Sequence, residues 1–503
     1  MSHKHLIDPI NRVEGDMAVE LTIDDSNKVT DARVLGFVYR GFENIFIGKR
    51  PFDAMRMSQR SCGVCPVSHG TAGAKAIEDM IKFKIPRNAQ LVRDIVLGSN
   101  IIVSHLTHFY FMWGPDLADK RYKDSPLYPE IIKRFDPLKS NHLKRILTQG
   151  RIPLHSIVAT FGGKFPHPMH AIPGGVSSTV KHIELIKTNT RLQEVKAFVE
   201  EEILNRIKVE DWLKIKSVKD VLELMKDEKF ANSDVGFFIK AGQEIGLHKF
   251  GEGTYNKFLA YGFGNNKDGS WLFKPGYLEE GKFHELDQTH ITEDTKNSYY
   301  ETEKDWRHPS DGVTKPIPRK EGAYSWVKSP RYFGHACELG PLARQMVNGD
   351  PLITDLVKQF GVNTFTRTLA RLHECLLILP KLTEWLAEID LEKPFYKPFP
   401  ENVTGKGAGL TEAPRGAIGH WVNAEDGVTT SYQIITPSSW NCSPTDGKGQ
   451  KSAVELSLVG VQLHDKDSML EAGHIVRSFD PCISCSIHAV GQKRKSIFVE
   501  PTR

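Results

Sequence analysis

The sequence predicts an α+β protein that is predominantly helical, with a central helical core and small peripheral β-sheets. Long segments of helical apolar periodicity, and short alternating segments near both ends, predict these two kinds of element. The 503 residues, 40% of them hydrophobic and 25% charged, are typical of a globular protein with a large core. A formal net charge of +4 is too small to indicate binding to nucleic acid or directly to an anionic membrane.

The first predicted elements are a hairpin and two helices. Residues 18–38 alternate between apolar and polar on either side of a turn-rich stretch, as in a β-hairpin. Helical periodicity follows at about 66–83 and 87–113. Polar residues interrupt the most apolar stretch, 95–114, which therefore predicts a buried core helix rather than a membrane span. The first residues carry no apolar stretch that would predict a secretory signal peptide.

The middle of the chain alternates between regular and irregular segments. Glycine and proline dominate 160–176 and predict a loop. Residues 181–208 predict an amphipathic helix, and we expect its apolar side to carry Ile183, Ile186, Leu192, Val195, Val199 and Ile203. From about 210 to 330 the periodicity is weak, which predicts an irregular, β-containing peripheral region. Helical periodicity returns at 338–390.

The last hundred residues predict short strands around 407–421 and 428–435, followed by a helix or turn with two cysteines. Seven cysteines are present, and four of them form two Cys-x-x-Cys pairs near opposite ends of the chain: Cys62, Cys65, Cys482 and Cys485. The odd, low count argues against a secreted disulfide scaffold and favours metal or redox chemistry in a reducing compartment.

Pro66 follows the first pair directly and suits the first position of a helix. The first pair should therefore precede a helix N-terminus, where the partial positive charge favours the thiolate form that binds metals.

Two simpler interpretations of the cysteine pairs are a structural zinc site and a thioredoxin-like redox pair. Zinc ribbons usually place their two pairs within about 15–40 residues of each other, far less than the separation here. A redox pair would explain one motif and leave the other without a role. Four thiolates from opposite ends of the chain favour a soft, sulfur-rich site for redox transition metals.

An ordered set of motifs runs through nearly the whole chain. It comprises Arg12–Gly15, Arg40–Glu43, Arg60–His69, His108–Tyr110 with Asp116, Gly163–Gly175, Tyr324–Tyr332, Glu338–Arg344, Glu412–Trp421, Pro437–Asn441 and Asp480–His488. One Cys-x-x-Cys pair would be weak support for any family. This set, in this order, resembles the large (catalytic) subunit of nickel–iron hydrogenases.

The resemblance implies a binuclear nickel–iron site whose iron carries one carbon monoxide and two cyanides. It implies that Cys62 and Cys482 are terminal nickel ligands, and that Cys65 and Cys485 bridge the two metals. Four anionic sulfurs suit a metal that changes its oxidation state. His69 matches a histidine that hydrogen-bonds a bridging sulfur and tunes its basicity, although a helix-surface histidine is the simpler interpretation.

The resemblance also implies roles for residues around the metals. Arg415 matches a permanently charged guanidinium that lies over the open site and is held by Asp116 and Asp480. An ordinary buried ion pair is the other interpretation of Arg415. The iron-ligand pocket is implied to include Pro414, Pro437 and Ser438. The Ser438 hydroxyl matches a donor to one cyanide, but a turn-capping serine fits the sequence equally well.

Heterolytic cleavage of hydrogen requires a base near nickel. Glu14 matches the proton-relay glutamate of the family, whereas an isolated carboxylate in such a turn would more often be solvated. The family motif usually ends in histidine, and Asp16 stands at that position here, so the onward proton route departs from the pattern.

A second metal ion is also implied. Glu43, His488 and a main-chain carbonyl near Ile434 match the ligands of a hard divalent ion, commonly magnesium. Without the resemblance, Glu43 would be interpreted as a salt-bridge residue and His488 as a surface residue.

The resemblance implies that residues 1–488 form one interlocked catalytic unit, and that an endopeptidase removes 489–503 after nickel-insertion factors have acted. By composition alone these last residues are an exposed basic tail. The remaining Cys337, Cys375 and Cys442 are too few for an iron–sulfur cluster and are expected to be packing residues. Electrons are therefore expected to leave through a separate iron–sulfur small subunit.

The predicted function is the reversible cleavage of H2 to two protons and two electrons. A hydrogen-sensing regulatory relative is the alternative, which the C-terminal extension disfavours, and a zinc-stabilised interaction protein is a more distant one. The related Complex I subunit lacks the paired cysteines found here. The protein is expected in the cytoplasm or at a membrane through its partners, and in the periplasm only by export with a signal-bearing small subunit.

Overall fold

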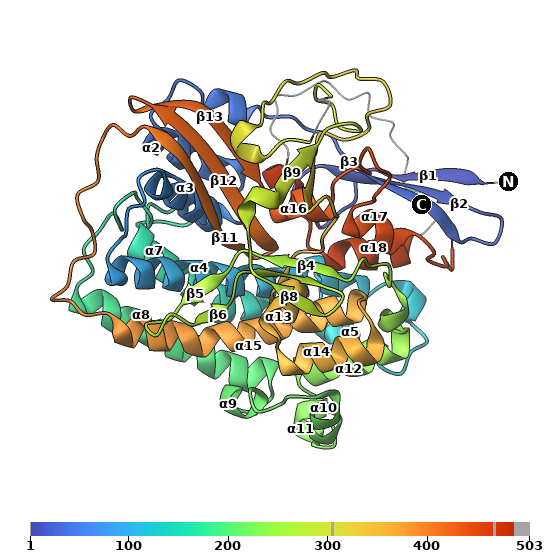
Figure 1. Cartoon of the computed structure of the whole chain (residues 1–503). Coiled ribbons are helices and arrows are strands. Elements are labelled where there is room, and N and C mark those ends of the chain that lie inside the picture. The colour runs from blue at the N-terminus through green and yellow to red at the C-terminus, as the bar shows by residue number, and fades with distance from the viewer. Residues whose placement is uncertain (1, 303–305, 466–468, 487–503) are drawn as a thin grey trace.

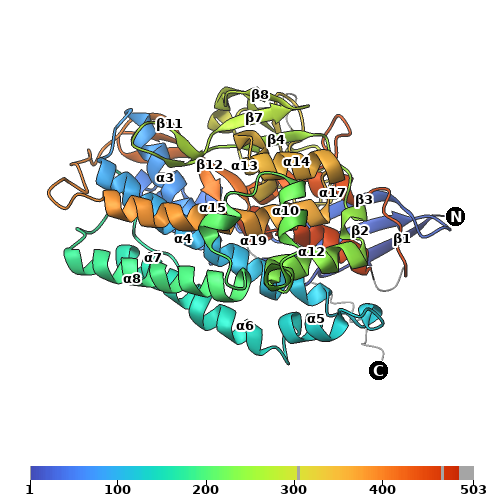
Figure 2. The same cartoon turned by 90° about the horizontal axis from the view of Figure 1, so that it is seen from below.

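The computed structural model of the chain describes residues 2–302, 306–465 and 469–486. Long helices run beside one another through the lower half of Figure 1, and sheets of two or three strands lie above and around them. The view from below in Figure 2 shows the same helices side by side. The predicted α+β fold with a helical core and small sheets is confirmed.

Four long helices form this core: α4 (Arg87–Thr107), α7 (Ile152–Gly162), α8 (His182–Phe198) and α15 (Thr364–Glu388). Helix α4 packs against α15 and α7, and α7 packs against α8. In the described part of the chain, Arg87–Asp116 is the one segment long and apolar enough to cross a membrane, but 83% of its most apolar window is buried inside the protein. This burial supports the predicted core helix.

Helix α8 departs from the expected apolar side. Leu192 and Val195 are buried, but Ile183 and Ile186 are 50% and 62% exposed. Successive helical residues turn by about 100°, so Ile183 lies half a turn around the axis from Leu192. The prediction that these residues share one side is wrong, because their spacing places them on opposite faces.

The N-terminal hairpin is confirmed as β2 (Met17–Ile23) and β3 (Val29–Gly36), and an unpredicted strand β1 (His3–Ile7) pairs with β2. The region expected to be irregular is more regular than predicted. It contains helices α10 (Val218–Leu224) and α12 (Asp234–Ile245) before its short strands, which run from β4 (Lys257–Ala260) to β9 (Ile291–Asp294).

The helical stretch at 338–390 is divided into α13 (Pro341–Asn348), α14 (Pro351–Phe360) and α15. Gly349 (φ 74°) and Gly361 (φ 74°) end the first two of these helices in conformations that favour glycine.

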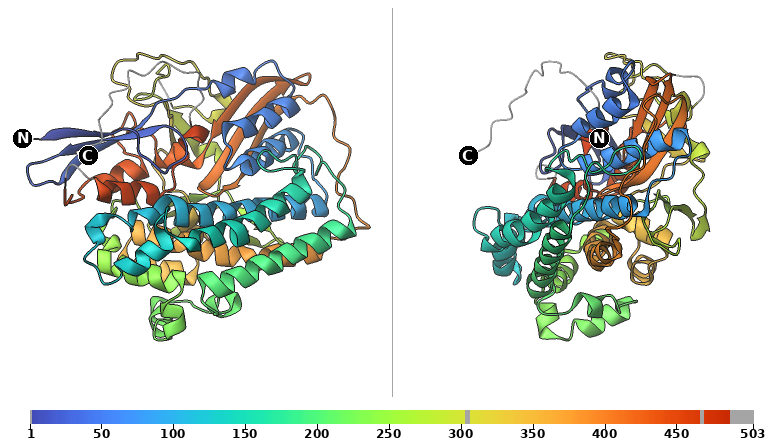
Figure 3. Two further views of the ribbon diagram at one scale, coloured as in Figure 1. Left: turned by 180° about the vertical axis from the view of Figure 1, so that it is seen from behind. Right: turned by 90° about the vertical axis from the view of Figure 1, so that its left-hand side faces the viewer.

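A three-stranded antiparallel sheet from the C-terminal part of the chain packs on a helix from the N-terminal part. Its strands are β11 (Gly405–Ala413), β12 (Gly416–Glu425) and β13 (Val428–Ile435). Strand β11 lies directly on α3 (Pro66–Met80), because Gly407 and Gly409 carry no side chain at the contact. A Cβ at these positions would lie 2.0 Å from Ala76 O and 1.9 Å from Ala72 O. The sheet thereby holds the β11–β12 turn next to α3, and both views of Figure 3 show the orange strands beside the blue helices.

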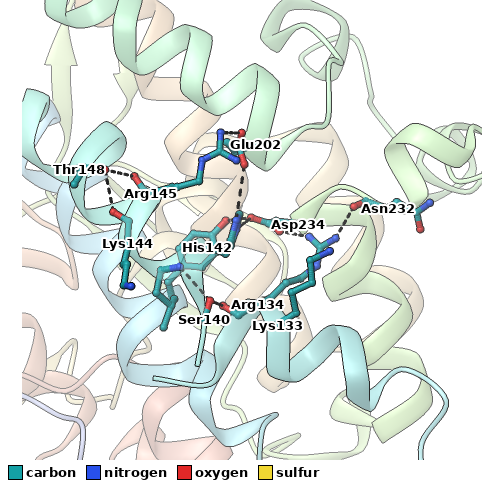
Figure 4. A network of polar contacts seen from close by, with 12 residues as sticks. Lys133, Arg134, Ser140, His142, Lys144, Arg145, Thr148, Glu202, Asn232 and Asp234 are labelled. Atoms are coloured by element: carbon teal, nitrogen blue, oxygen red, sulfur yellow. Dashed lines mark hydrogen bonds and ion pairs between the residues drawn. The ribbon is translucent and has the colours of Figure 1, made fainter. Parts of the chain in front are cut away.

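A buried carboxylate ties the helices at the end of the core opposite this sheet. Asp234 of α12 accepts a hydrogen bond from His142 Nε2 at 2.6 Å and forms an ion pair with Arg134 (Figure 4). Arg134 lies on α5 (Tyr128–Phe135), and His142 lies on α6 (Asn141–Arg145). Because Asp234 is 0% exposed, these bonds replace those that water would supply.

Candidate metal centre

Cysteines from the two ends of the chain converge on one point. The four Sγ atoms of Cys62, Cys65, Cys482 and Cys485 all lie within 4.8 Å of one another. Cys62 lies 3.4 Å from Cys482, Cys65 lies 3.1 Å from Cys485, and Cys482 lies 2.8 Å from Cys485. All four are at most 3% exposed. The predicted convergence is therefore present, and among the described residues this is the one group of three or more potential metal ligands.

The first pair is shaped by the start of α3. Cys65 is the residue before the helix and Pro66 is its first residue, as predicted. The amides of Val64 and Cys65 donate to Cys62 Sγ at 3.3 and 3.4 Å. Hydrogen bonds from the neighbouring thiols, Cys482 first, lower the pKa of Cys62 well below its usual value. Cys62 is thus poised as a thiolate, the form in which sulfur binds metals.

The second pair is docked against the N-terminal segment. The Glu14 amide donates to Pro481 O at 3.1 Å, and the Ile483 amide donates to Glu14 O at 2.7 Å. Gly15 has φ 88°, and a Cβ there would lie 2.5 Å from the Ser484 amide nitrogen. Only glycine allows this approach, which accounts for its place after Glu14.

Arg40 links the two cysteine pairs, a role the sequence did not reveal. One nitrogen of its guanidinium donates to the main-chain oxygens of both Ser61 and Ser484. Ser61 directly precedes Cys62, and Ser484 lies between the cysteines of the second pair. The feature of the sequence that could have indicated this role is the place of Arg40 in the Arg40–Glu43 motif.

Glu14 lies beside the thiols, as predicted. Burial raises the pKa of its carboxyl, the negative charge of Cys62 raises it further, and Arg415 and Arg40 lower it. A carboxyl with a raised pKa lies closer to neutral pH, where a proton acceptor is most effective.

Arg415 is held by Asp480, as predicted. Its Nε donates to Asp480 O at 2.7 Å and its Nη2 to Asp480 Oδ1 at 2.9 Å. Burial opposes the charge, but Asp480 and then the cysteine sulfurs, Cys482 first among them, raise the pKa of Arg415 well above its usual value. Arg415 Nη1 is buried and has no partner among the described residues.

Asp116 does not hold Arg415, so that part of the prediction is wrong. Its carboxylate accepts hydrogen bonds from Arg477 Nε at 2.6 Å and Nη2 at 2.8 Å, and it forms an ion pair with Arg12. Arg477 and Arg12 come from opposite ends of the chain, and the packing of α18 (Leu470–Ser478) places Arg477 on Asp116, whereas Arg415 binds Asp480.

His69 is fully buried on α3, which excludes a helix-surface role. Its Nε2 lies 3.0 Å from Ser61 Oγ, and its Nδ1 lies 3.1 Å from His420 Nε2. His420 Nδ1 in turn lies 2.8 Å from the Tyr432 hydroxyl. The predicted bond from His69 to a bridging sulfur stays a prediction.

Ser438 contacts the second cysteine pair directly. Its Oγ accepts the Cys482 amide at 2.8 Å. The side chain that caps the short helix α16 (Pro437–Asn441) is Thr436, so the capping interpretation of Ser438 is wrong. Pro414 and Arg415 form the buried turn between β11 and β12.

Two of the three predicted magnesium-site residues lie together. Glu43 of α1 (Phe42–Ile45) is 2% exposed, and its Oε1 accepts the Ile434 amide at 3.0 Å. Its Oε2 contacts Lys328 Nζ at 3.2 Å. His488 lies outside the described residues, and the carbonyl role near Ile434 stays a prediction.

The remaining thiols do not join the centre in the described part of the chain. Cys337, Cys375 and Cys442 are buried and scattered. Burial raises the pKa of each, in the case of Cys337 to about 12. They are neutral packing residues, as expected.

The residues present fit a nickel–iron centre. Four sulfur donors at mutual distances of at most 4.8 Å form a soft donor set, and the buried Nη1 of Arg415 is a donor that lacks a protein partner.

The chain matches a family model described as nickel-dependent hydrogenase over residues 40–122 and 139–488, and a HoxL-like model over 6–35. It is 31% identical to the periplasmic [NiFeSe] hydrogenase large subunit of Desulfomicrobium baculatum, covering 96% of this chain and 94% of that one. It is 28% identical to the quinone-reactive Ni/Fe-hydrogenase large chain of Wolinella succinogenes, covering 98% and 97%.

A solved structure of the Ni-Fe-Se hydrogenase from D. vulgaris Hildenborough matches with a TM-score of 0.83 and 31% identity, covering 97% of this chain and 100% of that one. The family model spans most of the chain, and the four cysteine thiols converge on one possible metal site. The chain therefore belongs to the nickel-dependent hydrogenase family as a catalytic large subunit.

Proposed function

We propose that this large subunit cleaves H2 heterolytically to two protons and two electrons, in a reversible reaction at the four-thiol centre. The convergence of four buried sulfurs beside a buried, permanently charged arginine carries the proposal. When bound, the nickel–iron centre supplies a redox-active Lewis acid that polarises H2.

Cys62 and Cys482 would hold nickel as terminal ligands, and Cys65 and Cys485 would hold both nickel and iron. The place of each cysteine in its motif supports this division, and the main chain of Glu14, the proposed proton acceptor, pairs with that of Cys482. His69 orders the first pair through Ser61.

Four residues would form the pocket for the iron's diatomic ligands, one carbon monoxide and two cyanides. The Nη1 of Arg415, which has no partner among the described residues, would donate to one cyanide, and the Ser438 hydroxyl would donate to the other. Pro414 and Pro437 wall the pocket. The orphaned Nη1 and the bond from Cys482 to Ser438 Oγ support this assignment.

Glu14 accepts the proton that leaves the centre. Its half-buried carboxyl lies between the thiols and the molecular surface, and its raised pKa favours reversible protonation. Asp480 keeps Arg415 charged and oriented. Asp116 acts further out, as the anchor of Arg477 and Arg12.

Glu43, His488 and the Ile434 carbonyl would hold a magnesium ion or a similar divalent ion. The burial of Glu43 beside the Ile434 main chain supports this placement. An iron–sulfur small subunit receives the electrons, because the large subunit has too few spare cysteines to carry a cluster of its own. The cell compartment follows from that partner, in the cytoplasm, at a membrane, or in the periplasm by joint export.

Metal analysis with infrared spectroscopy tests the proposed function. The purified complex is expected to contain one nickel per large subunit, with iron in excess of nickel because the small subunit carries iron–sulfur clusters, and to show stretches of one carbon monoxide and two cyanides. Zinc in place of nickel, or the absence of these stretches from matured protein, would exclude the proposed centre and support the zinc-stabilised alternative.

We also propose that a maturation endopeptidase removes 489–503 after nickel insertion, leaving 1–488 as the catalytic unit. The intact mass of the large subunit from active enzyme is expected to match a chain that ends at His488. The mass of the subunit from nickel-starved cells should match the chain that retains 489–503. Active enzyme that still carries Ala489–Arg503 would contradict this proposal.

A further inference from the structure

We infer that Arg344 is a positioning residue for Arg415, because it holds the buried turn that carries Arg415 beside the four thiols. The inference rests on the proposed role of Arg415. It adds a residue on α13 that contacts neither the thiols nor the substrate, and that acts only through the position of the turn.

Arg344 uses all five of its N–H groups, and every acceptor belongs to the protein. Nη1 donates to Ala413 O at 2.7 Å and to Glu412 Oε2 at 2.7 Å. Nη2 donates to Pro414 O at 3.2 Å and forms an ion pair with Glu374, to which Nε also donates at 3.0 Å. Two of the five acceptors are thus carbonyls at the turn itself.

The turn needs this support because it is buried. A two-residue hairpin turn normally points its carbonyls into water, but every residue from Thr411 to His420 is buried here. Without Arg344, the carbonyls of Ala413 and Pro414 would lose the donors that replace water, at the cost of an unpaired buried polar group.

Close backbone packing brings α13 to the turn. Gly416 has φ 128°, and a Cβ there would lie 2.8 Å from the Gly340 amide nitrogen. Gly340 is the residue before α13, and its carbonyl accepts the Arg344 amide at 2.9 Å. Arg344 therefore lies one turn of α13 beyond the Gly340–Gly416 contact. From this position its side chain reaches the β11–β12 turn.

The other end of the guanidinium is fixed to the helical core. Glu374 lies on α15, is 0% exposed, and also contacts His105 Nε2 of α4 at 2.9 Å. Burial opposes its charge, but Arg344 and His105 lower the pKa of Glu374 to about 2. Arg344 thus links α4 and α15, through Glu374, to Pro414, the residue directly before Arg415 in the turn.

Arg344→Lys tests the inference in the complete heterodimer. Lysine keeps the charge but offers three donors from one nitrogen, and it cannot span both the turn and Glu374. We expect H2 oxidation to fall about 100-fold, the effect of displacing a positioned group by about 1 Å. We also expect shifted infrared bands of the iron's ligands at unchanged nickel content.

Arg93→Lys is the matched control. Arg93 is equally buried, and it likewise binds a carboxylate, Glu78, together with the carbonyls of Ile172 and Gly175. Its loss should lower the unfolding temperature and leave the infrared bands unchanged. Where Arg344→Lys does not accumulate as folded protein, Glu412→Gln replaces it, and the same band shift with a smaller loss of turnover is expected.

Arg415→Lys distinguishes failure of the positioning role of Arg344 from failure of the proposed function of Arg415. Loss of turnover in Arg415→Lys with full turnover and unchanged bands in Arg344→Lys would overturn the positioning role alone. Full turnover in Arg415→Lys would overturn the proposed function of Arg415 itself. Equal band shifts in the Arg344 and Arg93 variants would show a general effect of packing and would also overturn the inference.

Discussion

Cys482→Ser is expected to abolish hydrogen oxidation and to lower the nickel content of the purified complex. Serine preserves the shape of the side chain, but a hydroxyl is a hard ligand that stays protonated at neutral pH. Loss of a partner outside the metal's own ligands typically costs about 10–100-fold in metal affinity, so loss of a ligand should exceed that range. Nickel content by mass spectrometry and H2-dependent dye reduction measure the two effects.

Cys442→Ser provides the control for this variant. Cys442 is also fully buried, on the apolar core beside β2 and β3, and lies outside the four-thiol group. This substitution should reduce thermal stability while nickel content and turnover per nickel stay at their original values. Full nickel occupancy in Cys482→Ser would contradict the assignment of Cys482 as a ligand.

Glu14→Gln is expected to lower H2 oxidation by about 100- to 10,000-fold, the range attributed to a positioned general base. The amide retains the shape of the side chain but cannot take up the proton that leaves the centre. The main-chain bonds of Glu14 to Pro481 and Ile483 do not involve the side chain, so the thiol geometry should persist. Turnover, nickel content and infrared bands distinguish these outcomes, and only turnover should change.

Asp16→Asn is the companion variant, because Asp16 is an exposed carboxylate two residues away. It should retain most of the turnover if Glu14 alone accepts the first proton. Retention of more than half of the activity in Glu14→Gln would show that the proton leaves by another group.

Much of the site followed from local features of the sequence. The Cys-x-x-Cys spacing and Pro66 sufficed to predict two thiols at a helix start, because both depend on a few neighbouring residues. The motif order sufficed to predict that the distant pairs meet, and to place Glu14, Arg415 and Asp480 around them. The fold class followed from apolar periodicity, which reports the burial of whole elements.

The errors concern which partner a side chain contacts and which face of a helix is buried. Asp116 was predicted to hold Arg415 and instead holds Arg477, because several arginines are available and residue type does not distinguish them. Ile183 and Ile186 do not lie on the buried side of α8, because Ile183 is half a turn around the axis from Leu192 and the neighbouring helices cover the face that carries Leu192.

The class of fold, the metal-binding thiols and the kind of chemistry they support can thus be predicted from the amino-acid sequence alone. How the thiols are held becomes visible once the chain has packed: by Arg40 across the two pairs, by Gly15 against Ser484, and by the Arg344 bonds to the turn before Arg415. This is because buried hydrogen bonds and ion pairs depend on angstrom-scale distances between elements far apart in the chain. Those distances arise only when the helices and sheets pack.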